Sequence, residues 1–168
     1  MHTTDGAVLR AVLFDRDGTL VHDVPYNGDP VLVRLVDGAE QALARLRAAG
    51  LRTGIVTNQS GIGRGLITRE QAEAVTAEVV RRVGGVDVVR LCEHAPDDGC
   101  RCRKPAPGMI ESALAELGLH PSEVAVVGDS PGDAAAAAAA GCRAVLVPQD
   151  APDLLAALDR LLPVVAAR

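Results

Sequence analysis

An alternation of short apolar runs with longer helical patterns is the feature that most constrains the fold of this chain. The apolar runs are rich in Val, Ile and Leu, and they lie at residues 7–14, 51–57, 86–92, 123–128 and 143–148. Nearly continuous apolar strands are typical of a parallel sheet that is covered on both faces. The helical patterns lie at about 38–49, 68–83, 106–117, 132–140 and 151–161. This order predicts an α/β fold, a Rossmann-like parallel sheet with right-handed crossovers and helices on both faces.

Local signals mark some of the helix boundaries. Thr68 with Gln71 three residues later has the pattern of a capping box at a helix start. Gly118 and Gly141 follow two of the expected helices and are plausible stops. The alanine-rich run at 133–141 predicts a buried helix whose small side chains let it lie close to the sheet.

Composition indicates one domain with an unusual core. The chain has 168 residues, enough to bury a core without disulfides, and we find no internal repeat, linker or second domain. We therefore expect residues 1–168 to form a single domain with no cap domain. Phe and Tyr occur once each and Trp never, so the core must consist of Val, Leu, Ile and Ala.

Charge and hydropathy exclude several classes of function. The formal net charge is −5 and the pI is near 5.3, and no basic stripe with interleaved aromatic residues is present, so we expect no nucleic-acid partner. The first ten residues lack the pattern of a secretory signal. No run reaches the ~18 apolar residues of a membrane span. We expect a soluble, cytoplasmic monomer that does not bind membranes.

Polar residues follow four of the expected strands. In open α/β sheets, ligands bind outside the carboxyl ends of the strands. The third expected strand leads into a loop with Cys and His, and the other three are followed by Asp15, Arg16 and Asp17, by Thr57, Asn58 and Gln59, and by Gly128, Asp129 and Ser130. Carboxylates, a hydroxyl and a cation at one edge of a sheet predict a functional site.

The carboxylates predict a cation. Asp15 and Asp17 come directly after a buried strand, and unpaired like charges this close together are costly. Asp129 is a natural neighbour from the fourth strand, with Asp133 one helical turn further on. Carboxylate oxygens with room left for water and a phosphate suit Mg²⁺. The alternative is that Asp15 and Asp17 only cap a turn.

A cluster of Cys and His at 92–102, here called the Cys/His loop, predicts a second metal. Cys92, His94, Cys100 and Cys102 are a complete ligand set for a closed, structural Zn²⁺ site. The alternatives are four unconnected residues or a disulfide between Cys100 and Cys102, which a reducing compartment disfavours. The remaining cysteine, Cys142, is interpreted as a small buried apolar residue.

Lys104 is the only lysine among 17 Lys and Arg residues. A compact ammonium group differs from the planar fork of arginine, so lysine at this one position suggests a geometric requirement. The alternative is a chance surface lysine beside Pro105.

Four motifs in this order resemble the haloacid dehalogenase superfamily of phosphatases: DRDGT, an apolar residue before TN, KP, and GDSPGD. The resemblance covers roughly residues 9–148. It implies an aspartyl-phosphate mechanism, in which Asp15 is the nucleophile and Asp17 is the general acid and base. It also implies that Asp15, Asp129 and the backbone carbonyl of Asp17 bind Mg²⁺, and that Asp133 orients these ligands. Thr57, Asn58 and Lys104 would hold the phosphate.

The Cys/His loop directly before RKP resembles a capless branch of this superfamily, the heptose-bisphosphate and histidinol phosphatases, and TNQSG with GIGRG adds to the likeness. The resemblance implies substrate contacts from Thr57, Asn58, Gln59, Ser60, Arg103 and Lys104, and from Asp23 and Tyr26. It implies zinc ligation by Cys92, His94, Cys100 and Cys102. Val21 and Ser130 depart from the pattern of the heptose enzymes, at positions expected near the substrate. Selectivity would fall to loops 21–30, 58–66 and 93–103.

The sequence therefore predicts a Mg²⁺-dependent phosphomonoester hydrolase of a small sugar phosphate. By resemblance the substrate is D-glycero-D-manno-heptose 1,7-bisphosphate, with removal of its 7-phosphate. Histidinol phosphate is the alternative substrate. A receiver-type signalling domain is disfavoured because the D-x-D pair follows the first strand rather than the third. A zinc-stabilised binding module without catalysis is disfavoured by the acid pair together with Lys104 and Asp129.

Overall fold

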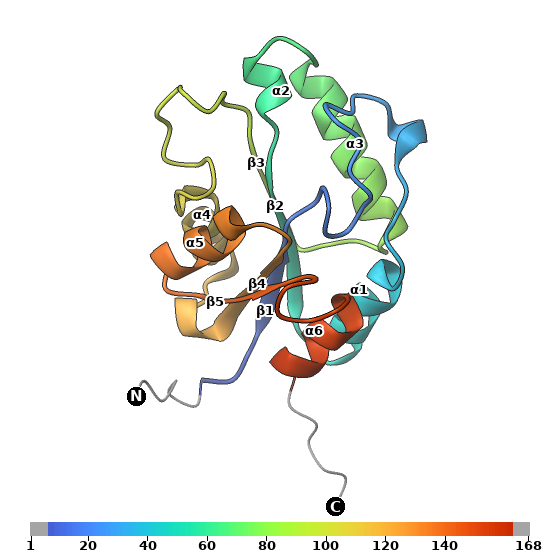
Figure 1. Cartoon of the computed structure of the whole chain (residues 1–168). Helices are drawn as coiled ribbons and strands as arrows, with labels where there is room; N and C mark the ends of the chain where they lie inside the picture. Colours follow the sequence, from blue (N-terminus) through green and yellow to red (C-terminus); the bar gives the residue numbers. More distant parts are fainter. Residues whose placement is uncertain (1–6, 163–168) are drawn as a thin grey trace, which may run out of the picture.

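A five-stranded parallel sheet forms the centre of the computed structural model, which describes residues 7–162 (Figure 1). Its strands are β1 (Ala11–Phe14), β2 (Arg52–Asn58), β3 (Val88–Cys92), β4 (Val124–Gly128) and β5 (Arg143–Leu146). The strand order is β3-β2-β1-β4-β5, and every neighbouring pair is parallel. The chain thus builds outward from β1 on one side and then on the other, which creates a crevice at the carboxyl end of β1. The predicted α/β fold is confirmed.

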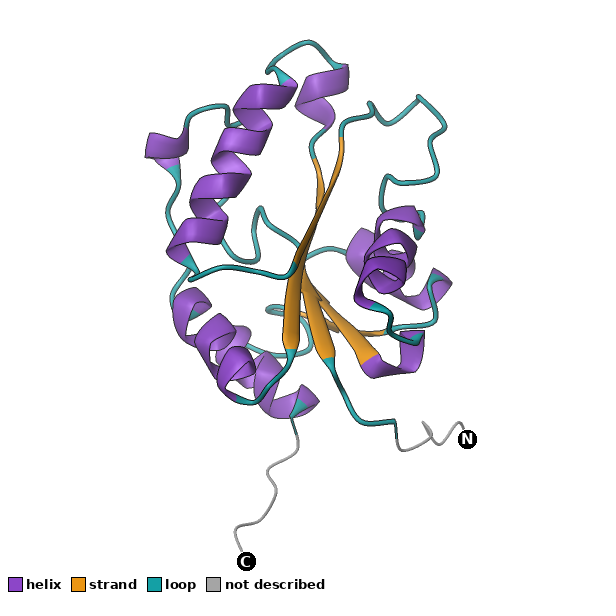
Figure 2. Ribbon diagram, turned by 180° about the vertical axis from the view of Figure 1, so that it is seen from behind, coloured by secondary structure: helices purple, strands orange, loops and turns teal. Residues whose placement is uncertain are grey.

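Helices cover both faces of the sheet (Figure 2). The helices α1 (Ala39–Ala48), α3 (Arg69–Arg82) and α6 (Leu154–Leu161) contribute to one buried cluster. The helices α4 (Gly108–Leu117) and α5 (Pro131–Ala139) contribute to the other. Three short helical segments complete the chain: α2 (Ser60–Gly63) and the 3-10 helices η1 (Pro30–Leu32) and η2 (Pro121–Glu123). None of the helices in residues 7–162 is long and apolar enough to cross a membrane.

The central strand shows why its sequence is continuously apolar. Val12 and Phe14 point into the cluster under α1, α3 and α6, whereas Ala11 and Leu13 point into the cluster under α4 and α5. Successive side chains of a strand face opposite sides, so a strand buried on both sides must be apolar at every position. Phe14 is the one aromatic residue of this core, and aliphatic side chains and alanine fill the rest.

Most helix signals in the sequence are present as expected. Gln71 donates its backbone N–H to Thr68 Oγ1 at 3.1 Å and accepts the Thr68 N–H at 2.9 Å, which confirms the capping box of α3. Gly118 and Gly141 follow α4 and α5 with φ of 65° and 80°, which are left-handed values that glycine adopts without strain. The short helix α2 was not expected.

Candidate active site

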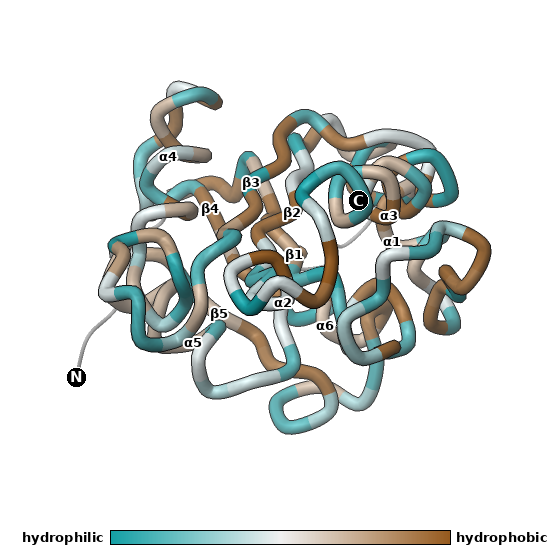
Figure 3. The backbone as a smooth tube through the Cα atoms, turned by 90° about the horizontal axis from the view of Figure 1, so that it is seen from above, coloured by the Kyte–Doolittle hydropathy of each residue, from teal (hydrophilic) through white to brown (hydrophobic). Residues whose placement is uncertain are grey.

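The predicted site lies where the carboxyl ends of the strands meet, on the edge viewed from above in Figure 3. Asp15 directly follows β1 and extends it, since its N–H donates to the Val127 carbonyl at 2.9 Å. A cavity of about 420 Å³ opens there, which we call the acidic cavity. Its lining includes Asp15, Asp17, Asp23, Asn58, Arg103, Lys104, Asp129, Ser130 and Asp133.

Lys104 lines the acidic cavity, and its ammonium group has three hydrogen-bond acceptors. Its Nζ lies 2.8 Å from Asp15 Oδ1, 2.6 Å from Asp133 Oδ1 and 2.9 Å from the Val56 carbonyl oxygen. The residue is only 7% exposed. Burial opposes its charge, but Asp15 and Asp133 together raise the pKa of Lys104 above its ordinary value. Three acceptors around one compact head provide a geometric reason for lysine here, and the alternative of a chance surface lysine is wrong.

Asp133 supports this arrangement from the first turn of α5. Its Oδ2 accepts hydrogen bonds from the Asp129 N–H, the Ser130 N–H and the Ser130 hydroxyl, at 3.1, 3.1 and 2.9 Å. Its Oδ1 accepts from Lys104, so both oxygens are occupied by donors. Ser130 in turn caps α5 by accepting the Asp133 N–H. Ser130 therefore lines the cavity, as expected, and also holds Asp133 in place.

Asp15 is in an environment that disfavours its negative charge. Burial raises the pKa of its carboxyl to about 8, Lys104 opposes the shift and Asp133 adds to it. Asp15, Asp129 and Asp133 offer carboxylate oxygens within 4.8 Å of one another, the grouping of a cation site. A divalent cation would favour the ionised form of Asp15. The hard oxygen donors, in an open cavity with room for water, fit Mg²⁺.

Glycine lets Asp129 approach the loop after β1. Gly18 has a φ of 81°, and a Cβ atom there would lie 2.3 Å from Asp129 Oδ2. Any other residue at position 18 would therefore push the carboxylate out of the cluster. Thr19 Oγ1 lies 3.3 Å from Asp129 Oδ1 on the same loop. The DGT part of the motif thus has a packing role beside Asp129, which explains its glycine.

Asp17 does not join the carboxylate cluster. Its carboxylate is turned toward Arg16, which donates from Nε to Oδ1 at 3.0 Å and from Nη2 to Oδ2 at 2.9 Å. Gln59 Nε2 donates to Asp17 Oδ2 at 2.8 Å and to Thr57 Oγ1 at 2.9 Å. Because the Thr57 oxygen accepts this bond, its proton is left to donate to a bound anion. Gln59, predicted to contact substrate, makes these two hydrogen bonds and also lines a neighbouring cavity.

Asn58 fastens the end of the Cys/His loop to β2. Its side chain accepts the Lys104 N–H at 3.0 Å and donates to the Lys104 carbonyl at 3.1 Å. These two bonds fix the backbone of the residue whose ammonium group meets Asp15. They use one of the two N–H groups of the Asn58 amide, so its second N–H is left to donate to a phosphate.

A second cavity of about 280 Å³, called the side cavity, adjoins the first. Asp17, Asp23 and Asn58 line both cavities, so the two meet at these side chains. The side cavity is otherwise lined by Val24, Pro25, Tyr26, Asn27, Gln59, Ser60 and Gly61. The predicted contact residues Asp23, Tyr26 and Ser60 thus gather in one place. Burial raises the pKa of Asp23, and the charges of Asp17 and Asp129 add to the shift.

Arg103 brings a further cation to the acidic cavity. Its Nη1 is buried and has no hydrogen-bond partner among the described residues. A buried unpaired guanidinium nitrogen is costly, and an anion in the cavity would relieve that cost. Arg103 is also tied to the Cys/His loop, because its N–H donates to Cys100 Sγ at 3.4 Å.

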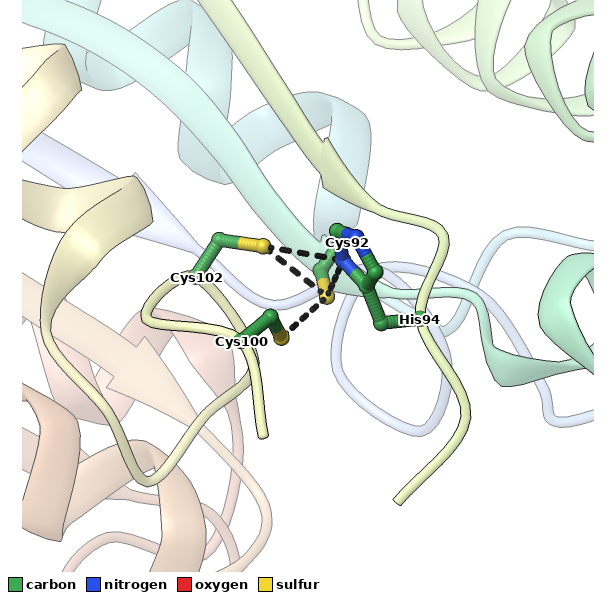
Figure 4. Close-up of side chains that lie close together, drawn as sticks. All are labelled: Cys92, His94, Cys100 and Cys102. Carbon is green, nitrogen blue, oxygen red and sulfur yellow. Dashed lines mark hydrogen bonds between the residues drawn. The ribbon is translucent and has the colours of Figure 1, made fainter. Parts of the chain in front are cut away.

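The four residues of the Cys/His loop converge on one point (Figure 4). Cys92 Sγ lies 3.7 Å from Cys100 Sγ and 3.2 Å from Cys102 Sγ, and the His94 Nδ1 lies 3.5 Å from Cys92 Sγ and 3.3 Å from Cys102 Sγ. All four cysteines of the chain are free thiols, so the alternative of a disulfide between Cys100 and Cys102 is wrong.

The geometry of this cluster fits a tetrahedral metal. Four ligands at the usual Zn–S and Zn–N lengths would be separated by about 3.5–3.8 Å, close to the distances observed. Burial raises the pKa of the Cys92 thiol to about 12, with further increases from its hydrogen bonds to Cys102 and Cys100. A bound cation would offset that penalty for the thiolate. The donor set is thus compatible with zinc.

Two features of the site differ from the sequence expectations. Arg16 follows the first strand in the sequence, but its role was not anticipated. Val21 was expected near the substrate, but its side chain is 4% exposed and packs in the core cluster under α1, α3 and α6. Val21 pairs with Leu35 and Asp17 in isolated bridges, which turns its side chain inward. The departure of Val21 from the pattern of the heptose enzymes therefore changes a side chain that packs in the core.

Three features together define a hydrolase of the haloacid dehalogenase type. They are the parallel sheet with its acidic edge, the buried Asp–Lys pair and the cluster of carboxylates. The family model for haloacid dehalogenase-like hydrolases matches residues 26–141, and the chain belongs to this family. The resemblance found in the motifs is confirmed.

Similar curated proteins share one specific enzyme name within this family. The D-glycero-beta-D-manno-heptose-1,7-bisphosphate 7-phosphatase of Pseudomonas aeruginosa is 40% identical over 145 residues, which cover 81% of this chain and 79% of the relative. The enzyme of the same name from Bordetella bronchiseptica is 38% identical over 144 residues, covering 83% of this chain and 80% of the relative.

A solved structure agrees with these relatives. The crystal structure of the D,D-heptose 1,7-bisphosphate phosphatase from B. bronchiseptica, in complex with magnesium and phosphate, matches with a TM-score of 0.83. It is 34% identical to this chain, and the match covers 92% of this chain and 98% of the other. This chain therefore shares its fold with a heptose bisphosphate phosphatase whose crystal structure contains magnesium and phosphate.

Proposed function

We propose that this protein is a Mg²⁺-dependent phosphatase that removes the 7-phosphate of D-glycero-D-manno-heptose 1,7-bisphosphate. The observation that carries the proposal is the buried pair of Asp15 and Lys104 at the end of β1, which opens onto a cavity with a further unpaired cation, Arg103. The heptose substrate rests on the names of relatives that cover about four fifths of this chain.

In the first step, an Asp15 carboxylate oxygen bonds to phosphorus as the bond between phosphorus and the sugar oxygen breaks. Asp17 gives its proton to the departing sugar oxygen. In the second step, Asp17 takes a proton from water, and the water oxygen attacks phosphorus and displaces Asp15. A carboxylate nucleophile divides one very slow displacement into two easier ones.

Lys104 and Thr57 support both steps. The Lys104 ammonium group lies beside the attacking oxygen and neutralises charge that would otherwise repel an incoming phosphate. Thr57 donates its free proton to a phosphoryl oxygen. Asp15, Asp129 and the backbone carbonyl of Asp17 would hold Mg²⁺, which supplies positive charge against the phosphoryl oxygens. Asp133 keeps Lys104 and the backbone of Asp129 in place.

The two cavities divide the substrate into two parts. The acidic cavity, with Asp15 and Lys104, receives the phosphoryl group that is transferred. The side cavity, with Asp23, Tyr26 and Ser60, receives the sugar. Arg103 lines the acidic cavity and supplies a guanidinium group to a substrate phosphate. An open site of this kind accepts small soluble phosphates without a lid.

We further propose that Cys92, His94, Cys100 and Cys102 bind a structural Zn²⁺. The four ligands leave no open position for water, so the metal stabilises the loop and takes no part in the chemistry. Three reduced cysteines in one loop also favour a reducing compartment, in agreement with a cytoplasmic enzyme.

Phosphate release tests the proposal. With Mg²⁺, the protein is expected to release one equivalent of phosphate from the heptose 1,7-bisphosphate, and Asp15→Asn is expected to abolish turnover because an amide is a poor nucleophile. Unchanged thermal melting and zinc content are the controls for folding. Turnover by Asp15→Asn at the wild-type rate would rule out the aspartyl-phosphate mechanism.

A further inference from the structure

Asp17 lies at the boundary between the two cavities. If the transferred phosphoryl group occupies the acidic cavity and the sugar occupies the side cavity, the oxygen that joins them lies at this boundary. A general acid must reach that oxygen and must present a defined carboxylate edge to it. The groups that fix the orientation of Asp17 are therefore of mechanistic interest.

Three hydrogen bonds fix the Asp17 carboxylate. Arg16 binds it with two parallel bonds, 3.0 Å from Nε to Oδ1 and 2.9 Å from Nη2 to Oδ2, and Gln59 adds a bond of 2.8 Å to Oδ2. A planar guanidinium group that makes two bonds restricts both the position and the rotation of a carboxylate. The Asp17 side chain nevertheless remains 28% exposed toward the cavities.

Arg16 is itself fixed from the opposite side. It is 1% exposed and is the largest fully buried side chain of the described residues. Its Nη1 donates to Thr76 Oγ1 on α3 at 2.8 Å, and the Thr76 hydroxyl donates to the Ala72 carbonyl at 2.9 Å. The acceptor lone pair of Thr76 is thereby aimed at Arg16. Asp17 is the one carboxylate that forms an ion pair with Arg16 within residues 7–162.

A buried arginine needs a compensating role in stability or in function. Burying a guanidinium group is costly, and an apolar residue of similar volume is often equally stable. Here the guanidinium group connects a helix in the hydrophobic layer to a carboxylate at the cavity boundary. The connection spans 60 residues of sequence.

We propose that Arg16 is a positioning residue for Asp17, and that Thr76 on α3 fixes the orientation of the Arg16 guanidinium group. The inference rests on the proposed role of Asp17 as the general acid and base. Arg16 touches neither the phosphate nor the attacking Asp15 in this role. Its effect on the reaction passes entirely through the orientation of Asp17.

A positioning role for the acid makes a prediction that depends on the leaving group. An alkyl phosphate such as a sugar phosphate needs a proton on its departing oxygen, whereas 2,4-dinitrophenyl phosphate has a stable phenolate as its leaving group and needs none. Because kcat/KM reports steps up to the first irreversible one, it isolates transfer of the phosphoryl group to Asp15. Disorder in Asp17 should therefore lower kcat/KM for the sugar phosphate far more than for the dinitrophenyl ester.

The first experiment measures both substrates with Arg16→Met, which keeps an unbranched side chain but removes the fork. General acid catalysis contributes about 10²–10⁴-fold, so we expect kcat/KM for the sugar phosphate to fall about 100-fold or more. For the dinitrophenyl ester we expect a loss of less than about fivefold. Arg16→Lys keeps a charge without the two-bond geometry and is expected to behave like Arg16→Met.

A matched pair on α3 tests the same idea at a distance from the cavity. Thr76→Val removes the hydroxyl that accepts from Arg16, whereas Thr76→Ser keeps it. We expect Thr76→Val to lose about tenfold on the sugar phosphate with little change on the dinitrophenyl ester, and Thr76→Ser to restore the wild-type ratio. The two Thr76 variants test the positioning role of Arg16 even if Arg16→Met fails to fold.

The outcomes separate this inference from the proposed function. Equal losses on both substrates, or equal ratios for Thr76→Val and Thr76→Ser, would overturn the positioning role. If Asp17→Asn itself turns over the sugar phosphate like the wild type, the proposed role of Asp17 fails. If Asp17→Asn shows the leaving-group effect and the Arg16 and Thr76 variants do not, only the inference about Arg16 fails.

Discussion

Lys104 combines two tasks at the scale of a single residue. Its ammonium group pairs two carboxylates and a carbonyl oxygen, while its backbone is held by Asn58. Three acceptors at 2.6–2.9 Å surround the ammonium group and leave little space for a larger head group. This residue therefore offers a test of whether the site needs a positive charge or a particular shape.

Lys104→Arg keeps the charge, and Lys104→Met removes it with similar length. We expect both to lower kcat/KM by about 10²–10³-fold, because removing one electrostatic donor from such a site costs about that much. Steady-state kinetics with saturating Mg²⁺ checks this. Near-normal activity in Lys104→Arg would show that charge alone suffices and would contradict the geometric argument.

The convergence of Asp15 and Asp129 was predictable because both directly follow strands, whereas the contacts of Arg16 were not. Parallel strands end at a common edge, a property that the alternation of elements already implies, and Lys104 reaches this edge from the segment between β3 and α4. Arg16 stands between two aspartates, but its burial depends on α3, which lies 60 residues further along the chain. A local pattern does not contain that contact. The burial of Val21 likewise involves a contact outside its own segment, the bridge to Leu35.

At the scale of elements, the Cys/His loop is held at several points. Gln59 and Gly63 donate backbone hydrogen bonds to the Cys92 and Glu93 carbonyls at 2.7 and 2.8 Å, which dock α2 against the loop. A Cβ at Gly63 would lie 2.6 Å from the Ala95 nitrogen, so this close approach requires glycine. The loop nevertheless has no regular structure between β3 and α4. A metal would therefore make a large contribution to its order.

Cys100→Ser is expected to lose zinc and to lower thermal stability, with a weaker secondary loss of activity, because structural metal binding contributes directly to folding. Metal analysis of protein purified without chelator checks this, and the wild type should hold about one equivalent. The matched control is Cys142→Ser, since Cys142 is buried beside α5, outside the cluster. Burial raises the pKa of its thiol to about 11.

The control should keep its zinc whatever its stability. Less than about half an equivalent of zinc in the wild type would count strongly against the metal assignment. Full zinc content in Cys100→Ser, with unchanged melting, would instead remove Cys100 from the ligand set.

Element types were predicted well and element boundaries less well. The first apolar run was expected to form a strand from residue 7, but β1 begins at Ala11 and Val8 is 77% exposed. An apolar residue in a loop is not distinguishable from a strand residue by its chemistry. The helix expected from 151 begins at Leu154, because the Asp153 side chain accepts the Ala156 N–H and caps it there. Caps of this kind are local, so Asp153 marks this helix start within the sequence itself.

At the scale of the whole molecule, loops that follow separate strands surround the two cavities. The side cavity is built by the loop after β1 and the segment after β2, and the acidic cavity adds the end of the Cys/His loop. Tyr26, the only tyrosine of the chain, is 47% exposed with a φ of 50°, and it packs against Gly61 across the side cavity. The side cavity, which we propose receives the sugar, is thus assembled from segments that lie apart in the sequence.

A substrate panel tests this assignment. We expect kcat/KM to favour heptose 1,7-bisphosphate over histidinol phosphate and a generic aryl phosphate by about 100-fold or more, equivalent to about 2.7 kcal/mol of transition-state discrimination. Both anomers should be measured, with Asp15→Asn as the blank. A preference for histidinol phosphate would keep the chemistry and change the substrate. A uniform rate across the panel would mean that the side cavity does not select.

The placement of Lys104 two residues after Cys102 has a thermodynamic consequence. Two ligands that order the same segment are linked, and the coupling between them is reciprocal. Whatever factor zinc contributes to the affinity for a phosphate, the phosphate contributes to the affinity for zinc. If zinc bound at the loop raises the affinity of the enzyme for a phosphate, the enzyme with phosphate bound holds zinc more tightly at equilibrium than the free enzyme, by the same factor.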